Sequence, residues 1–414
     1  MTDPDKLDPR EIDLREIDRA DVYIGDDLAA HLIRQRGDNV SFDYLDPGHT
    51  TDRGVRDRSV SWSLLRTDEN PVTTSGAVPA FFAGPLPEGV RLGVVTSSMK
   101  TSADDHLTLL LAIGADTIGN IRVFPAGADP ARPLPLFEPG RDTDFRAVVA
   151  TMTGSVDADP VGLAGVQPKV SAGVLSTPTQ TKSGSAILKL APTQYPLLVE
   201  NEHFFMTMAA ACGLRVAKTS VLHDAEGRSA LLVTRFDREG AIRIAQEDAC
   251  QVAKVYPASK YRIKTETAIT GLAAACARGG GSKVAATAEL LKTVAFSWLI
   301  GNGDLHGKNL SIYNPTGIWQ PTPAYDLLCT QPYQGWKDPM ALNLYGRANK
   351  LDRTHFIEAG ERLGLRQRAI TNVIDTLVDA AKGWPERCDQ IGFDDRHTAL
   401  LTEMLRSRIG SLEK

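Results

Sequence analysis

The sequence predicts an α+β fold, in which a strand-rich lobe with one helix is followed by a helical lobe, and a small mixed α/β domain precedes both. Between Gly162 and Gly240 the apolar residues form short strand-like runs around one helical pattern, and past Gly240 the patterns are mainly helical. Residues 125 to 139 are dense in proline, as in a semi-rigid linker. At 414 residues the chain is also too long for a single core.

The N-terminal third predicts a charged extension and then a small domain. Residues 1 to 21 are strongly acidic and carry the tetrad Arg-Glu-Ile-Asp twice, which predicts an extension that is partly disordered. Short apolar runs broken by Gly, Pro and Asn follow, and they predict an accessory domain over residues 22 to 140. Its clearest elements are strands at Val22 to Ile24, Val40 to Phe42 and Ile121 to Phe124, and a helix at Leu107 to Ile113.

The two lobes are predicted over residues 141 to 240 and 241 to 414. In the first lobe we expect strands at Val170 to Leu175, Ala186 to Leu190 and Ala230 to Phe236, and a helix at Asn201 to Cys212. In the second lobe we expect helices at Glu266 to Ala277, Lys283 to Ile300, Thr354 to Leu363, Arg366 to Lys382 and Thr398 to Ile409.

Composition excludes several classes of protein. A formal net charge of -5 gives no broad basic field, so DNA contact is expected only through a partner. The five cysteines are dispersed, without CxxC spacing, which predicts reduced thiols in the cytoplasm. No apolar stretch reaches the length of a membrane span, and the N-terminus lacks the pattern of a signal peptide.

The chemistry is concentrated in Gly301-Asn302-Gly303-Asp304-Leu305-His306-Gly307-Lys308-Asn309 and in Tyr325-Asp326. Asp304, Asn309 and Asp326 have the order that phosphoryl transfer requires: one Asp for the attacking hydroxyl, an Asn five residues later for a metal, and a later Asp that holds Mg²⁺ against the nucleotide phosphates. The apolar run before the loop predicts a buried helix, and Leu310 to Tyr313 alternates like a strand, so rigid elements flank the loop. An ordinary helix-to-strand turn would use the same Asp and Asn for turn chemistry.

A strand-rich lobe followed by a helical lobe is also the layout of a protein-kinase-like core, with the nucleotide between the lobes. Lys189, with apolar neighbours on both sides in its strand, is the candidate phosphate anchor. Glu202 lies three residues before Phe205, on the apolar side of the predicted helix, where a lone carboxylate needs a cation such as Lys189. Glu200 is the competing candidate, and a solvated Glu at a helix start is the structural alternative for both.

The loop from Gly162 to Lys169 is a weaker candidate. Its backbone N–H groups could cover phosphates, although Pro168 contributes none, and the stretch is neither GxGxxG nor a Walker motif. Without the residues further along the chain, an ordinary loop is the better explanation.

Taken together, these pieces resemble the HipA family of bacterial serine/threonine kinases, the toxins of type II toxin-antitoxin systems. The resemblance covers nearly the whole chain. Its motifs are Gly162 to Lys169, Lys189, Val199 to Phe204, Leu232 to Arg238, Gly303 to Asn309, Pro323 to Asp326 and Met340 to Gly346.

The resemblance implies roles for individual residues. Asp304 would be the catalytic aspartate, supported by Lys189 and Glu202, with Asn309 and Asp326 as the Mg²⁺ ligands. The ATP-binding residues would be Ala164, Gly165, Val166, Gln167, Lys169, Lys189, Thr234, Arg235, Phe236, His306, Gly307, Lys308, Asn309, Tyr325 and Asp326. We expect His306 to be a structural loop histidine instead of the catalytic base.

The resemblance also implies partners. These are a small HipB-like helix-turn-helix antitoxin that represses the shared operon, and a translation-related protein substrate such as an aminoacyl-tRNA synthetase. Two positions depart from the family pattern: Gly162 stands where the self-inhibiting phosphoserine is common, and Thr234 replaces an acidic residue. Ser155, Ser171 or nearby threonines could take the place of that serine, although nothing in their spacing selects any of them.

Two other functions fit parts of the sequence. A small-molecule kinase of the aminoglycoside or choline phosphotransferase type has a similar loop, but Asn302 stands where that group usually has His, and those enzymes lack the accessory domain. A catalytically silent nucleotide-binding co-repressor is the non-enzymatic alternative, and ATP turnover would exclude it.

Overall fold

The computed structural model describes residues 13–45, 59–128, 130, 139, 143–153, 174–181 and 184–414. The chain divides into two compact units, Met1–Leu134 and Pro135–Lys414. The division falls inside the proline-dense stretch at residues 125 to 139. The limits expected at 140/141 and 240/241 remain predictions.

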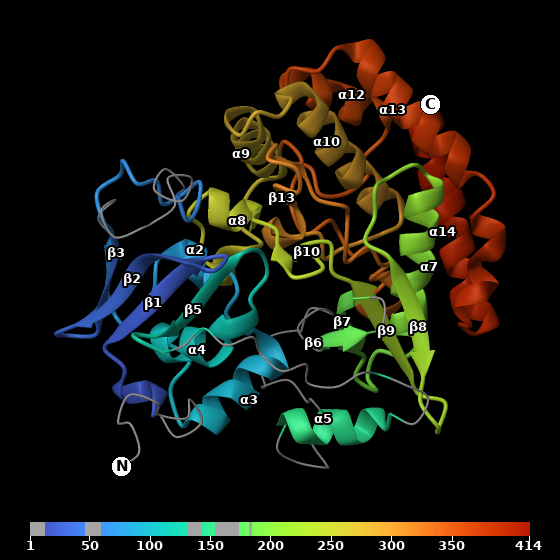
Figure 1. Cartoon of the computed structure of the whole chain (residues 1–414). Coiled ribbons are helices and arrows are strands. Elements are labelled where there is room, and N and C mark those ends of the chain that lie inside the picture. Colours follow the sequence, from blue (N-terminus) through green and yellow to red (C-terminus); the bar gives the residue numbers. More distant parts are fainter. Residues whose placement is uncertain are drawn as a thin grey trace, which may run out of the picture. The chain divides into compact units, whose positions relative to one another are not determined.

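The first unit is built on an antiparallel sheet with the strand order β4-β3-β2-β1-β5 (Figure 1). Its strands are β1 (Arg19–Ile24), β2 (Asp27–Gln35), β3 (Asn39–Tyr44), β4 (Val72–Thr73) and β5 (Ile121–Pro125). The α-helices in the described part of this unit are α2 (Ala80–Ala83), α3 (Gly89–Met99) and α4 (His106–Ile113). Since β1 begins at Arg19, the acidic extension expected over residues 1 to 21 is wrong at its end: residues 19 to 21 already pair with β2.

The second unit contains a four-stranded antiparallel sheet with the order β6-β7-β9-β8. Its strands are β6 (Leu175–Thr181), β7 (Gly184–Leu190), β8 (Thr219–His223) and β9 (Ser229–Thr234). The strand expected at Val170 to Leu175 is displaced, because β6 begins at Leu175, and residues 170 to 173 lie outside the described part. Strand β8 was not predicted, because its side chains are all half-buried or exposed and give no apolar alternation.

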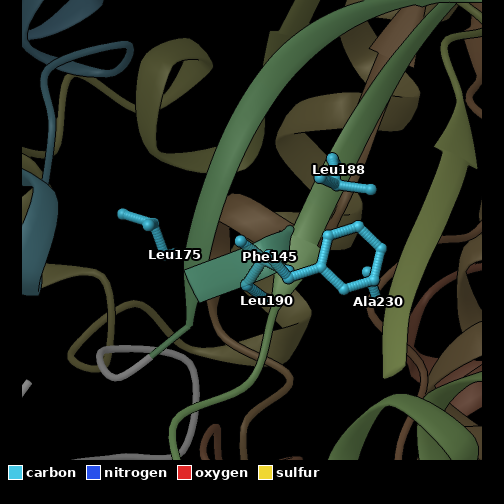
Figure 2. Close-up of a cluster of buried hydrophobic side chains, with 5 residues drawn as sticks. All are labelled: Phe145, Leu175, Leu188, Leu190 and Ala230. Atoms are coloured by element: carbon cyan, nitrogen blue, oxygen red, sulfur yellow. The ribbon is translucent and has the colours of Figure 1, made fainter. Parts of the chain in front are cut away.

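One face of this sheet carries a small apolar core (Figure 2). Phe145 of α5 (Phe145–Thr153) packs with Leu188 and Leu190 of β7, together with Leu175 and Ala230. Side chains alternate between the two faces of a strand, so Lys189 points to the opposite face from its two leucine neighbours. Helix α7 (Leu198–Ala211) supplies the partner that Lys189 meets there.

The remainder of the second unit is mainly helical, as expected. The predicted helices correspond to α9 (Thr265–Arg278), α10 (Lys283–Leu299), α12 (Arg353–Arg362), α13 (Gln367–Ala381) and α14 (Asp395–Glu413). Shorter elements are the β10 (Arg238–Glu239) and β11 (Ile242–Arg243) hairpin, α8 (Ala249–Val252), α11 (Gln331–Gln334), and the 3-10 turns η4 (Pro257–Ser259), η5 (Gly307–Asn309) and η6 (Pro385–Ile391). A second small sheet joins β12 (Gln246–Asp248), β13 (Ser311–Tyr313) and β14 (Gln320–Pro321), so the residues after the Asp304 loop are tied into a sheet. The predicted α+β class is confirmed.

None of the helices in the described ranges combines the length and the apolar character that crossing a membrane requires. All five cysteines lie in the described residues, are buried, and form no disulfide bond there.

Candidate active site

Lys189 lies between two carboxylates that are far from it in the sequence. Its Nζ donates to Oε1 of Glu202 at 2.7 Å, and it also donates to Oδ1 of Asp326. The Lys189 side chain is 13% exposed and that of Glu202 is 8% exposed. The pairing expected between Lys189 and Glu202 is therefore present, whereas Glu200 accepts a hydrogen bond from Ser229. The roles of these residues remain predictions.

The protonation of this cluster follows from burial and charge. Burial alone would lower the pKa of Lys189, but the nearby Asp326 and Glu202 carboxylates outweigh it and raise the pKa above the usual value. Burial raises the pKa of Glu202, and the Lys189 ammonium opposes that rise. Lys189 therefore stays positively charged, and a lysine ammonium is a compact point charge of the kind that binds phosphate.

The loop that carries Asp304 begins where α10 ends. Asn302 holds this loop in two ways: its Oδ1 accepts from the backbone N–H of Asp304 at 2.9 Å, and its Nδ2 donates to the backbone carbonyl of Asp326 at 3.3 Å. One carboxamide therefore connects the backbones of the two aspartates. The side chain of Asp304 is almost fully buried.

Gly303 allows a close approach of the segment that follows Asp326. Its backbone N–H donates to Oγ1 of Thr330 at 2.8 Å, and Thr330 in turn donates to Oδ2 of Asp338 at 2.9 Å. A Cβ at position 303 would lie 1.9 Å from Oδ2 of Asp338, so this hydrogen-bonded pair leaves no room for a side chain. The contact fixes the loop one residue before Asp304.

The residues expected to bind metal offer oxygen ligands. Nδ2 of Asn309 donates to the backbone carbonyl of Asp304 at 3.1 Å, which orients this carboxamide and leaves Oδ1 as its acceptor. Asp326 has a left-handed backbone with φ 54° and presents a carboxylate that is about one third exposed. A carboxylate oxygen and a carboxamide oxygen suit Mg²⁺, so the residues present fit this ion.

Tyr325 ties Asp326 to the Asp304 loop. Its hydroxyl donates to the carbonyl of Lys308 at 2.6 Å and lies 2.5 Å from Oγ of Ser311. Burial raises the pKa of Tyr325 well above its usual value, so the hydroxyl stays protonated and remains a donor. The contact holds the backbone just before Asp326 against the turn that contains Asn309.

The segment expected to meet adenine follows β9. Thr234 is exposed, and its N–H donates to the carbonyl of Lys218 at 2.8 Å. Arg235 is buried and forms two hydrogen bonds with Asp237, at 2.9 and 2.7 Å, so its guanidinium holds the connection between the lobes. The ring of Phe236 packs on that of Tyr325, with a centroid distance of 5.8 Å. Since Tyr325 directly precedes Asp326, this segment lies close to the backbone of Asp326.

The other predicted nucleotide residues divide into two groups. His306 and Gly307 are buried and Lys308 is half-buried, within the same turn as Asn309. The glycine-rich residues Ala164, Gly165, Val166, Gln167 and Lys169 lie outside the described residues, as do Gly162, Ser155 and Ser171. The structure therefore does not test the predicted loop over the phosphates.

Sequence reasoning missed Asn201, which joins α7 to the segment after Asp326. Its Nδ2 donates to the carbonyl of Cys329 at 2.9 Å, and its Oδ1 accepts from the N–H of Cys329 at 2.9 Å. Asn201 is fully buried four residues before Phe205. A carboxamide on the apolar stripe of a predicted helix was the available signal, because a buried polar side chain must find partners. Tyr261 and Asp338 gave no comparable signal.

Comparison with known proteins identifies the family of the chain. The sequence profile of the HipA-like C-terminal domain matches residues 161–384, and that of the HipA N-terminal domain matches residues 20–124. The chain is 31% identical to a Sinorhizobium fredii protein named "Putative kinase Y4mE" over 351 residues, which is 76% of this chain and 83% of that protein.

Two Shewanella oneidensis matches extend the comparison. The chain is 30% identical to the serine/threonine-protein kinase toxin HipA over 307 residues, which is 65% of this chain and 67% of that protein. A solved structure of a HipA, HipB and operator DNA complex contains a chain that matches with a TM-score of 0.71 and 22% identity, over 95% of this chain and 97% of that one. The overall fold is therefore the kinase-like fold of HipA, and the chain belongs to the HipA family.

Proposed function

We propose that this protein is an ATP- and Mg²⁺-dependent serine/threonine protein kinase that acts in the cytoplasm as the toxin of a HipA-type toxin-antitoxin module. The observation that carries the proposal is the convergence of Lys189, Glu202 and Asp326, with the Asp304 loop fastened to the backbone of Asp326 through Asn302. The named relatives, described as kinases, support the same reaction class.

In the proposed reaction, Asp304 accepts a hydrogen bond from the hydroxyl of a substrate Ser or Thr and takes its proton as the oxygen attacks the γ-phosphorus of ATP. The bond between that phosphorus and the β,γ-bridging oxygen breaks, and ADP leaves. Lys189 places its ammonium against the nucleotide phosphates, and Glu202 keeps that ammonium in position. Asn309 and Asp326 would hold Mg²⁺, which supplies positive charge for the phosphate oxygens. Positioning and electrostatics provide the acceleration.

The proposed partners follow from the family. The Shewanella oneidensis HipA was solved together with HipB and operator DNA. We propose a HipB-like helix-turn-helix antitoxin as the partner of this chain, with DNA bound only through that antitoxin. The proposed substrate is a translation-related protein, with an aminoacyl-tRNA synthetase as the first candidate.

Expression in cells tests the proposal. The wild-type chain and the Asp304→Ala variant are expressed in parallel, and new phosphoserine and phosphothreonine sites are mapped by mass spectrometry. We expect sites that depend on Asp304, and a loss of about 10³-fold or more in transfer by the purified variant with little change in nucleotide binding. Equal phosphorylation by the two proteins would refute the role of Asp304, and transfer only to small alcohols would favour a small-molecule kinase.

A further inference from the structure

A short segment after η4 lies directly on the catalytic loop. The carbonyl of Lys260 accepts a hydrogen bond from the N–H of Gly307 at 3.1 Å. A Cβ at position 307 would lie 2.8 Å from Cγ2 of Ile263, so the glycine permits this approach. Between these two contacts, the ring of Tyr261 meets the ring of His306 edge to face, with centroids 5.2 Å apart. The position of Tyr261 is therefore fixed from both sides.

The hydroxyl of Tyr261 donates to Oδ1 of Asp304 at 2.7 Å. The last torsion of an aspartate side chain is broad, so a carboxylate that is held only by its backbone can rotate. A hydrogen bond to one oxygen removes that freedom, and the acceptor capacity of Oδ2 is then available for a second donor. Asp304 is 3% exposed, so water has little access to its carboxylate.

We propose that Tyr261 is a positioning residue for phosphoryl transfer. Its hydroxyl fixes the Asp304 carboxylate so that Oδ2 receives the hydrogen bond and then the proton of the substrate hydroxyl. This inference rests on the role proposed above for Asp304. The physical basis is that a general base works only when it is held within hydrogen-bond reach of the proton that it takes. Tyr261 itself gains and loses no proton in the reaction.

The alternative is that the hydrogen bond from Tyr261 to Asp304 is inhibitory. In that case the tyrosine hydroxyl occupies the place of the substrate hydroxyl and blocks Asp304. The fixed position of the segment favours positioning, because Lys260 and Ile263 hold it against the loop on either side of the tyrosine. The two roles predict opposite changes in rate when the hydroxyl is removed.

The test compares Tyr261→Phe with Tyr256→Phe in the purified full-length protein. Tyr256 is a half-buried tyrosine five residues earlier in the same stretch, so it controls for loss of a phenol hydroxyl. ADP release and phosphoprotein formation are followed together, with MgATP titrated in each protein. For Tyr261→Phe we expect kcat to fall about 10- to 100-fold, with KM for MgATP within about twofold of wild type and an unchanged thermal midpoint. Tyr256→Phe should match the wild type in kcat, in KM for MgATP and in thermal midpoint.

Several outcomes overturn the inference. An unchanged kcat in Tyr261→Phe removes the positioning role, and a raised kcat shows that the hydroxyl blocks Asp304. A fall in kcat with an equal loss of MgATP affinity or thermal stability shows a structural role only.

Failure of the proposed function gives a different pattern. Wild-type protein that consumes ATP through Asp304 without forming phosphoserine or phosphothreonine refutes the proposed substrate class. ADP release still tests Tyr261 in that case, because Asp304 must orient the attacking water in the same way. Wild-type protein without any Asp304-dependent consumption of ATP overturns both proposals.

Discussion

Two clusters in the second unit each join one cation to two or three carboxylates, and they differ in how far apart their members lie in the sequence. Lys189 pairs with Glu202 and Asp326, which are 13 and 137 residues away. Arg228 pairs with Asp144, Asp224 and Glu226 at 2.5, 2.6 and 2.9 Å, and two of these partners are within four residues of it.

Exposure separates the two clusters further. Asp144 and Glu226 have side chains that are 54% and 59% exposed, whereas Lys189 and Glu202 are nearly enclosed. Asp224 also accepts the N–H groups of Glu226 and Arg228, which closes the turn between β8 and β9. Exposed pairs contribute little to stability, whereas buried charges from distant elements are costly to bring together. The Arg228 cluster thus stabilises the turn of a hairpin. Pairing with Arg228 accounts for the grouping of its three carboxylates without a bound metal ion.

Among the variants that test this comparison, the largest effect is expected from Lys189→Met. The variant keeps the length of the side chain and removes the phosphate anchor, so transfer should fall about 10²- to 10³-fold. Steady-state kinetics with MgATP measures this loss, with Lys189→Arg as the control that keeps a positive charge. Activity within tenfold of wild type in Lys189→Met would place the anchor elsewhere.

The same variant should change the pH dependence of stability. Burial raises the pKa of Glu202, and without Lys189 nothing comparable opposes that rise. The folded state of the variant then binds more protons than the unfolded state, so its free energy of unfolding decreases as pH rises above the unfolded pKa of a glutamate, about 4.3. Urea unfolding should show that Lys189→Met lowers the free energy of unfolding more at pH 8 than at pH 5.5. An equal decrease at the two pH values would contradict this account.

Asp326→Asn should give the next largest effect. A neutral carboxamide is a weaker ligand for Mg²⁺ and no longer balances Lys189, so MgATP affinity should fall about 10- to 100-fold. Calorimetric titration of MgATP measures this change. Asp379→Asn is the matched control, because Asp379 is an exposed partner of Lys382. Unchanged MgATP affinity in Asp326→Asn would count against the metal assignment.

Asn201→Ala should have a smaller effect on both stability and activity. It leaves the buried N–H and carbonyl of Cys329 without their carboxamide partner, which should cost about 1–3 kcal/mol of unfolding free energy. Transfer should fall about tenfold, because the segment after Asp326 loses its connection to α7. Thr207→Ala on the same helix is the control, since within the described part of the chain the side chain of Thr207 donates only to the carbonyl of His203 in its own helix. Equal urea midpoints for the two variants would show that the Asn201 contact is dispensable.

Arg228→Met should have the smallest effect. Because Asp144 and Glu226 are largely exposed, and the buried Asp224 keeps its hydrogen bonds from backbone N–H groups, the free energy of unfolding should fall by no more than about 1 kcal/mol. Kinase activity should stay within about twofold of wild type. Urea unfolding and a transfer assay check both values. A loss of activity comparable to that of Lys189→Met would erase the distinction between the two clusters.

Periodicity in the sequence predicted most of the long helices and the strand that carries Lys189. The pattern Ala-Ile-Leu-Lys-Leu placed Lys189 opposite two buried leucines, and helical spacing placed Glu202 on the inner side of α7. The spacing of Asp304, Asn309 and Asp326 along the sequence predicted phosphoryl transfer. Spacing is informative there because the number of residues between such groups follows from a loop of fixed conformation.

The contacts made by single side chains across long loops could not be predicted. Tyr261 reaches Asp304 from 43 residues earlier, and Thr330 reaches Gly303 from 27 residues later, through turns that have no periodic pattern. Strand β8 was missed for a related reason, since it lies at an edge of its sheet and has no fully buried side chain.

The neighbours Asn201 and Glu202 give α7 a further property. Asn201 bonds the backbone of Cys329, and Glu202 pairs with Lys189. Adjacent residues of the helix therefore contact both the four-stranded sheet and the segment after Asp326. A turn of the helix by one residue, about 100°, would withdraw both side chains together. The contacts of Lys189 and of the Cys329 backbone with this helix therefore depend together on the orientation of α7.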